Sequence, residues 1–231
     1  MPAPSRNIAL LLFLRSETQE ALAKPLAEGG RRVNTAIYQR LNQYIRRQAR
    51  ESGLPLLVVK GGRQTGRTFG ERLANAFEYA FGQGYSHVIA IGNDCLSLDA
   101  GRLREAAGQL EQGDIVFGPA KDGGVYLLGL SRQAFSRRLF LGLPWQTGQL
   151  MAALEKYSRR MCCMPFLLKE EEDADTPLSF RRLLRRLPSR NYLRLALQCL
   201  LMPATGPHLL FTLLSSAGIK QTCPLRGPPV K

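Results

Sequence analysis

The stretch HVIAIGNDCLSL at residues 87–98 decides the expected fold. Its first part, His87–Ile91, is a short continuous apolar run, which is typical of a strand buried on both faces. The run ends at Gly92, and Asn93 and Asp94 follow it directly. In open α/β sheets, ligands bind outside the carboxyl ends of the strands. We therefore predict a ligand site at Gly92, Asn93 and Asp94, with capping of the next turn by Asp94 as the alternative.

Similar apolar runs alternate with stretches of helical period on both sides of this segment. The expected strands are Ile8–Leu14, Leu56–Val59 and Asp114–Gly118, and the expected helices are Asn34–Ser52, Phe69–Phe81 and a helix from its Asp99 cap to Gln112. Such alternation predicts a mostly parallel sheet with helices on both faces. Val125–Leu130 follows the fourth strand without room for a crossover helix, so we expect it to run antiparallel.

The remainder of the chain divides into two parts. A helix around Gln146–Tyr157, a strand near Cys163–Leu168 and a basic helix after Pro177 complete a predicted domain at residues 1–187. Residues 188–231 form a predicted apolar helical extension, with helix candidates at Leu193–Met202 and His208–Leu214. We expect the extension to pack on the domain or on a second subunit, so a homodimer stays open. An interfacial contact with an acidic membrane, aided by nearby arginines, is the alternative.

The composition limits the class of protein. The 231 residues are 45% apolar and 22% charged, which fits one globular domain. Five scattered cysteines without metal spacing predict reduced thiols, and the apolar run near the start is too short for a signal peptide or a membrane span, so we expect a cytoplasmic protein. The net charge of +14 suits an anionic partner or solvated helix faces. No nucleic-acid-binding motif is present, and we expect no nucleic acid partner.

A second chemical signal is GPAKDGGVYLLGL at residues 118–130. Asp122, Gly123 and Gly124 lie between two strand-like runs, and Asp-Gly alone is typical of a hairpin turn. Gly118 and the basic Lys121 are expected at the same end of the sheet as Asp94. Glycines also permit a ligand to approach the backbone closely. We therefore predict that this turn belongs to the ligand site.

Two further segments combine local structure with chemistry. Trp145, the only tryptophan, is expected where a loop meets a helix, where it stacks on a base or sugar or packs in the core. Thr147 follows in the same loop, where it either binds the ligand or begins the helix. In the acidic run before Pro177, Asp175 or Thr176 caps the next helix, or Asp173 or Asp175 supplies a further metal ligand.

These segments, in this order, resemble the DUF2064 family of bacterial proteins, which is placed in the GT-A glycosyltransferase superfamily. The resemblance covers residues 8–184 and is densest at 66–147. The motifs that carry it stand at Gly92–Leu96, Gly118–Gly129, Pro144–Thr147 and Asp173–Pro177. More distantly, the layout is similar to phospholactate guanylyltransferase and the molybdenum-cofactor nucleotidyltransferases.

The resemblance implies a GT-A-like, Rossmann-like three-layer sandwich whose mostly parallel central sheet contains an antiparallel strand. It places Asp94 at the metal-binding aspartate and Asp122 in the acceptor or phosphate region. Leu96 stands where the family often has proline. Ala23–Leu26 replaces the basic Lys-Thr-Arg-Leu segment that typically follows the first strand. The candidates to replace its basic side chains are Arg15, Lys24, Arg67 and Arg72.

The resulting hypothesis is a metal-dependent, glycosyltransferase-like transferase with a nucleotide-sugar donor. Asp94 and Asp122 are the predicted catalytic residues, and Asp94 and Asp175 are the predicted ligands of Mg²⁺ or Mn²⁺. The predicted nucleotide-binding residues are Arg15, Lys24, Arg67, Gly92, Asn93, Gly118, Lys121, Gly123, Gly124, Trp145 and Thr147. The alternatives are a nucleotidyltransferase that acts on a phosphorylated small molecule and a non-catalytic binding or scaffold protein that retains the fold.

Overall fold

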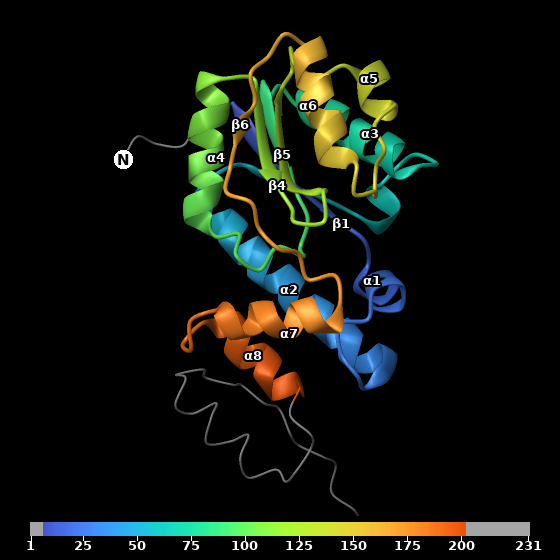
Figure 1. Cartoon of the computed structure of the whole chain (residues 1–231), viewed down its shortest axis with the longest axis vertical. Helices are drawn as coiled ribbons and strands as arrows, with labels where there is room; N and C mark the ends of the chain where they lie inside the picture. The colour runs from blue at the N-terminus through green and yellow to red at the C-terminus, as the bar shows by residue number, and fades with distance from the viewer. Residues whose placement is uncertain (1–6, 202–231) are drawn as a thin grey trace, which may run out of the picture.

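A six-stranded sheet forms the centre of the computed structural model, which describes residues 7–201 (Figure 1). The strand order is β2-β1-β3-β5-β4-β6. The strands are β1 (Ile8–Leu14), β2 (Leu56–Lys60), β3 (His87–Ile91), β4 (Ile115–Pro119), β5 (Val125–Ser131) and β6 (Phe166–Leu167). Only β5 is antiparallel to its neighbours, β3 and β4. The predicted fold class, including the antiparallel strand, is confirmed.

The continuous apolar sequence of β1 is explained by burial on both faces. Ala9 and Leu11 pack in a cluster with α3 (Phe69–Gly82) and α6 (Leu150–Arg160). Leu10 and Leu12 alternate with them and pack in a second cluster with α2 (Gly30–Ser52) and α4 (Ala100–Gln112). Successive strand residues point to opposite faces, so a strand between two helical layers must be apolar throughout. Figure 1 shows α4 and the group of α3, α5 (Arg137–Leu141) and α6 on opposite sides of the sheet.

Local capping explains several of the observed helix ends. Asp99 accepts a hydrogen bond from the backbone N–H of Arg102 and caps α4, as predicted. Gly53 ends α2 in the left-handed conformation, at a φ of 78°. The helix α1 (Glu17–Ala23) was not predicted, because one short helix gives little periodicity. Its capping box, formed by Ser16 and Gln19, is the local signal for it.

Several predicted boundaries were wrong. The helix expected at Asn34–Ser52 begins earlier, at Gly30. The helix expected from Gln146 begins at Leu150, because Gln146 has a φ of 63° and cannot continue a right-handed helix. The strand expected at Cys163–Leu168 is reduced to β6, Phe166–Leu167, at the sheet edge. The loop that replaces the start of α6 contains Trp145 and Thr147, so this difference affects the site.

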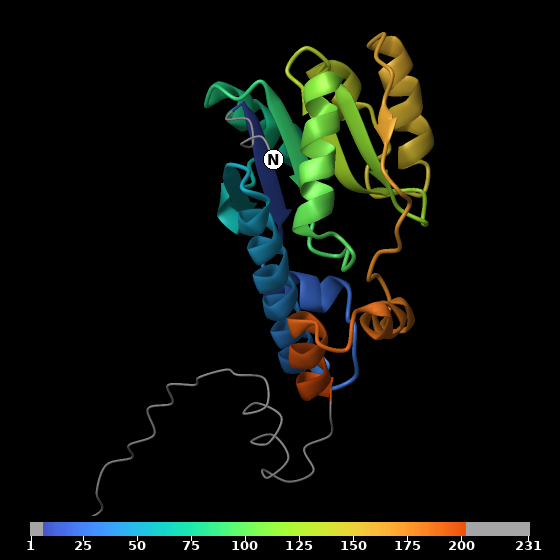
Figure 2. The same ribbon diagram turned by 90° about the vertical axis from the view of Figure 1, so that its left-hand side faces the viewer.

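A third apolar cluster lies beyond the sheet. The helices α7 (Pro177–Arg186) and α8 (Tyr192–Leu201) pack at one end of α2, below the sheet in Figure 2. Phe180 of α7 and Leu193 and Leu197 of α8 are fully buried there. The division at residues 187 and 188 stays a prediction, and the candidate helix His208–Leu214 lies outside the described residues. Within residues 7–201, no helix has the length and apolar character that a membrane crossing requires.

Candidate functional site

A cleft of about 630 Å³ opens at the carboxyl ends of β1 and β3. This is the rim at which open α/β sheets bind ligands, and the volume suits a small molecule. Several segments that are far apart in sequence meet there. The predicted site residues that line it are Arg15, Lys24, Gly92, Asn93, Asp94, Asp122, Gly124, Trp145, Thr147 and Asp175.

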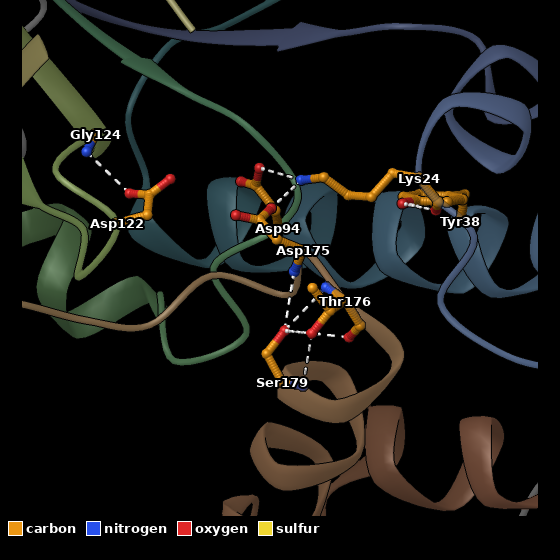
Figure 3. Close-up of polar contacts among 8 residues, drawn as sticks. All are labelled: Lys24, Tyr38, Asp94, Asp122, Gly124, Asp175, Thr176 and Ser179. Carbon is orange, nitrogen blue, oxygen red and sulfur yellow. Dashed lines mark hydrogen bonds and ion pairs between the residues drawn. The ribbon is translucent and has the colours of Figure 1, made fainter. Parts of the chain in front are cut away.

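The centre of the cleft is an ionic cluster around Lys24. Its ammonium nitrogen lies 3.6 Å from Asp94 Oδ2 and donates a hydrogen bond to Asp175 Oδ1. Figure 3 shows both carboxylates at the Lys24 ammonium, with Asp122 on the other side of them. The side chains of Asp94 and Asp175 are 34% and 35% exposed, so a solvent cation can reach both.

Backbone contacts bring the acidic run to Asp94. The backbone N–H of Ala174 donates to the carbonyl oxygen of Asp94 at 3.0 Å. Thr176 caps α7 and exchanges hydrogen bonds with Ser179. The cap is therefore Thr176 rather than Asp175, and the Asp175 carboxylate accepts a hydrogen bond from Lys24 instead.

Asp173, the residue before Ala174 in the acidic run, is the most deeply buried acid of the cleft. Its Oδ1 is buried and has no hydrogen-bond partner in the described chain. Burial, and then the nearby charges of Asp94 and Asp175, raise the pKa of Asp173 to about 9. Buried polar atoms are normally paired, so the unpartnered oxygen indicates a missing donor or cation.

Lys24 is held at this position by its backbone. It ends α1, and its carbonyl oxygen accepts a hydrogen bond of 2.7 Å from the Tyr38 hydroxyl of α2. Burial alone would lower the pKa of Lys24, but the carboxylates of Asp94 and Asp175 outweigh it and raise the pKa above its usual value. Lys24 is therefore charged at neutral pH.

Asp122 lies in a tight turn between β4 and β5. Its Oδ1 accepts a hydrogen bond of 2.9 Å from the backbone N–H of Gly124. Gly123 has a φ of 85°, and a Cβ there would lie 2.0 Å from the carbonyl oxygen of Gly148. The paired glycines thus allow the turn to pack against the backbone of the loop before α6.

Trp145 and Thr147 line the cleft while their polar atoms make structural bonds. The indole nitrogen of Trp145 donates to the carbonyl oxygen of Phe140 at 2.9 Å. The Thr147 hydroxyl donates to the carbonyl oxygen of Pro144 at 2.8 Å. Trp145 also packs so closely on Gly70 that a Cβ there would lie 2.5 Å from the ring. What these residues present to a ligand is therefore mainly apolar surface.

Four predicted binding residues do not line the cleft. They are Arg67, Gly118, Lys121 and Gly123. Gly118 makes room for the ring of Tyr126, and Lys121 joins the sheet edge through its backbone N–H, which donates to Glu171. Sequence reasoning missed Glu20, which lines the cleft from the unpredicted helix α1.

The charge of the cleft is opposite to that of the chain. Its acidic side chains are Glu20, Asp94, Asp122, Asp173 and Asp175, and its basic side chains are Arg15 and Lys24. Acids outnumber bases even with Asp173 protonated. The described residues contain no group of three or more His, Cys, Asp or Glu side chains arranged as a metal cage. A cation held by Asp94 and Asp175 would complete its shell with water and substrate phosphates, as Mg²⁺ often does.

The six-stranded, mostly parallel sheet between two layers of helices gives the chain a GT-A-like α/β fold. More specifically, the chain belongs to the DUF2064 family, described as "Uncharacterized protein conserved in bacteria (DUF2064)", whose sequence pattern matches residues 22–147. No match was found among curated proteins.

A solved structure shares this fold, and two others are similar to the chain at lower TM-scores. A proposed nucleotide-diphospho-sugar transferase from Desulfovibrio desulfuricans G20 superimposes with a TM-score of 0.76 at 20% identity, over 92% of this chain and 99% of that one. A CMP:2-keto-3-deoxy-manno-octonic acid synthetase complexed with CTP gives a TM-score of 0.41 at 10% identity, over 76% and 96%. Rv0371C from Mycobacterium tuberculosis H37Rv, in complex with manganese, gives 0.40 at 14% identity, over 78% and 100%.

Proposed function

We propose that this protein is a metal-dependent transferase that uses a nucleotide-activated donor, with a nucleotide sugar as the donor class. The observation that carries the proposal is the convergence of Asp94, Asp122 and Asp175 in one cleft beside Lys24. The description of the Desulfovibrio structure as a nucleotide-diphospho-sugar transferase supports the same class.

The donor set fits a hard divalent cation. Asp94 and Asp175 already hold one cation, the Lys24 ammonium, and the unpartnered Oδ1 of Asp173 lies in the same cleft. An acidic cleft repels a free diphosphate, so a cation is needed to admit one. Mg²⁺ or Mn²⁺ bound by Asp94 and Asp175 would offset the charge that develops on the leaving diphosphate.

The other residues bind and orient the substrates. Arg15 lines the cleft at the end of β1, where it would bind a phosphate of the donor. Trp145 offers its ring to a base or sugar. Asp122 approaches the metal-binding aspartates from the opposite side to Lys24, where it would orient the acceptor hydroxyl and accept its proton (Figure 3).

A thermal-shift screen tests the proposal. Nucleoside diphosphates and nucleotide sugars should raise the melting temperature only when Mn²⁺ or Mg²⁺ is present. A ligand at a hundredfold excess over its Kd adds about 2.7 kcal/mol to the free energy of unfolding, which gives a measurable shift. Asp94→Asn should abolish the shift. The control Glu111→Gln removes one exposed acid of α4 outside the cleft and should keep it.

The other outcomes assign the other classes. A shift with nucleoside triphosphates alone would indicate nucleotidyl transfer instead. No shift with any nucleotide, with or without metal, would contradict an enzymatic role and favour a scaffold that retains the fold.

A further inference from the structure

The net positive charge of the chain is concentrated in the residues that follow Asp175. Asp175 is the last acidic residue of the sequence, and the 56 residues that follow it contain no Asp or Glu. Within α7, α8 and their connection, residues 177–201, all the basic residues are arginines. They are Arg181, Arg182, Arg185, Arg186, Arg190 and Arg194. This segment alone therefore carries a formal charge of +6.

The charged and the apolar residues of α7 lie on opposite faces of the helix. Phe180, Leu183 and Leu184 are buried against the rest of the molecule. The opposite face is exposed and consists of Leu178, Arg181, Arg182, Arg185 and Arg186. These positions follow the helical spacing of three and four residues, so they form one face.

Few of these arginines are neutralised. Glu172 accepts hydrogen bonds from Arg182 and Arg186. Arg181 and Arg185 make no ion pair within residues 7–201. Two unpaired guanidinium groups four residues apart on one exposed face favour an anionic partner.

Exposed apolar side chains accompany the arginines. Leu178 is 73% exposed on α7, and Tyr192 and Leu195 are 40% and 36% exposed on α8. Arg194 of α8 donates hydrogen bonds to the carbonyl oxygens of Arg185 and Leu187, which joins the two helices. Both views place α7 and α8 together at one end of the molecule (Figures 1 and 2).

We propose that the exposed surface of α7 and α8 binds the face of a bilayer that contains anionic phospholipids. Arginines attract anionic headgroups, and exposed leucine and tyrosine side chains insert at the boundary between headgroups and acyl chains. Nucleic acid would use the arginines but gains nothing from Leu178 and Leu195, so the apolar side chains favour the membrane. The inference does not depend on the proposed transferase activity.

The position of α7 gives this surface a consequence for the cleft. The helix begins at Pro177, two residues after Asp175, so the membrane-binding face follows the acidic cleft directly in the chain. A protein bound through α7 and α8 would hold its cleft close to the bilayer, where a lipid-linked acceptor could reach it.

Vesicle co-sedimentation of the full chain tests the proposal. The protein should sediment with vesicles of phosphatidylcholine and phosphatidylglycerol, remain in solution with phosphatidylcholine alone, and be released by salt. The double variant Arg181→Glu/Arg185→Glu should lower vesicle affinity about thirty-fold or more, at roughly tenfold per 1.4 kcal/mol and about 1 kcal/mol per basic residue. Leu178→Ser should lower it less.

The matched control is Lys156→Glu/Arg159→Glu, which makes the same charge change on the exposed side of α6, at the far end of the molecule in Figure 1. It should keep native vesicle affinity, and both double variants should keep the native melting temperature. Equal binding to both vesicle types, or equal loss in both double variants, would overturn the proposal. Retention by RNA with no sedimentation on vesicles would also overturn it and assign the arginines to nucleic acid.

Discussion

Lys24 places its ammonium group between two carboxylates that a divalent cation would also bind. The alkyl chain crosses the cleft from the end of α1, and the backbone is anchored by Tyr38. A cation that binds Asp94 and Asp175 must therefore displace the ammonium or share its carboxylates. Once a divalent cation has displaced it, the Lys24 ammonium group is available to bind a donor phosphate. Lys24 thus occupies the position at which the family's basic first-loop segment is missing from this chain.

This competition predicts the effect of Lys24→Met. The variant keeps the apolar stem and removes the ammonium, so Mn²⁺ affinity in the absence of nucleotide should rise roughly tenfold, as expected for a lost contact between like charges near a protein surface. Electron paramagnetic resonance of free Mn²⁺ measures it. Arg15→Met is the control, since Arg15 lines the same cleft and makes no ion pair within residues 7–201. An equal rise in both variants would show that Lys24 acts only through the general field.

Asp173 leads to a second prediction for a single residue. Its carboxyl group is buried beside other carboxylates and one of its oxygens has no partner. Because burial raises its pKa to about 9, Asp173 must take up a proton on folding at pH 7, which costs stability; Asp173→Asn removes this cost, so the metal-free variant should melt at a higher temperature than the native protein at pH 7. The additional stabilisation by Mn²⁺ should become smaller, because an amide is a poorer ligand. Calorimetry with and without Mn²⁺ checks both, and a lower melting temperature in the metal-free variant would contradict the assignment.

At the scale of elements, the turn between β4 and β5 depends on Gly123. Gly123→Ala forces a Cβ into the carbonyl oxygen of Gly148 at a positive φ, which should cost roughly 2–4 kcal/mol in the free energy of unfolding. Displacement of the turn should also move Asp122 and weaken donor binding. The control Gly108→Ala lies in α4 with open space around it and should stabilise by about 0.5–1 kcal/mol. Urea titration compares the two; a neutral Gly123→Ala would mean that the turn can relax.

The elements that local patterns describe were predicted well. The strands β1 and β3 begin and end at the predicted residues, and α4 follows its predicted Asp99 cap. Their periodicity and caps are properties of neighbouring residues, which the sequence contains. The short helix α1 was missed because one short helix gives little periodicity, and the left-handed Gln146 was missed because no periodic pattern indicates it. The boundaries near Trp145 were wrong for this reason.

The site was predictable only in part, because contacts between residues far apart in sequence leave no local pattern. The positions of Asp94 and Asp122 at one rim follow from strand direction, which the pattern of elements predicts. The contact between Lys24 and Asp175 joins residues 151 positions apart, and the burial of Asp173 depends on every element around it. Neither has a local signature. The catalytic and metal-binding roles of these residues stay predictions.

At the scale of the whole molecule, charge is divided between two regions. An acidic cleft lies at the sheet rim, while the arginines of residues 177–201 lie beyond it in α7, α8 and their connection. Asp175 and Pro177 join the regions within three residues. This arrangement allows the molecule to attract an anionic surface without filling its own cleft with anions. The net charge of +14 therefore says little about the cleft itself, where acidic side chains outnumber basic ones.

The packing of α8 decides whether the molecule unfolds as one unit. Leu197 is fully buried in the cluster that α8 shares with α1, α2 and α7, and α2 also packs on the sheet. Leu197→Ala should therefore destabilise the whole domain by roughly 3 kcal/mol and lower the single melting transition by about 6–12 °C. Leu195→Ala, at a 36% exposed position of the same helix, should change it little. A separate low-temperature transition, with the main one unmoved, would show instead that α8 is an independent appendage. Because α2 connects this cluster to the sheet, we expect one cooperative transition.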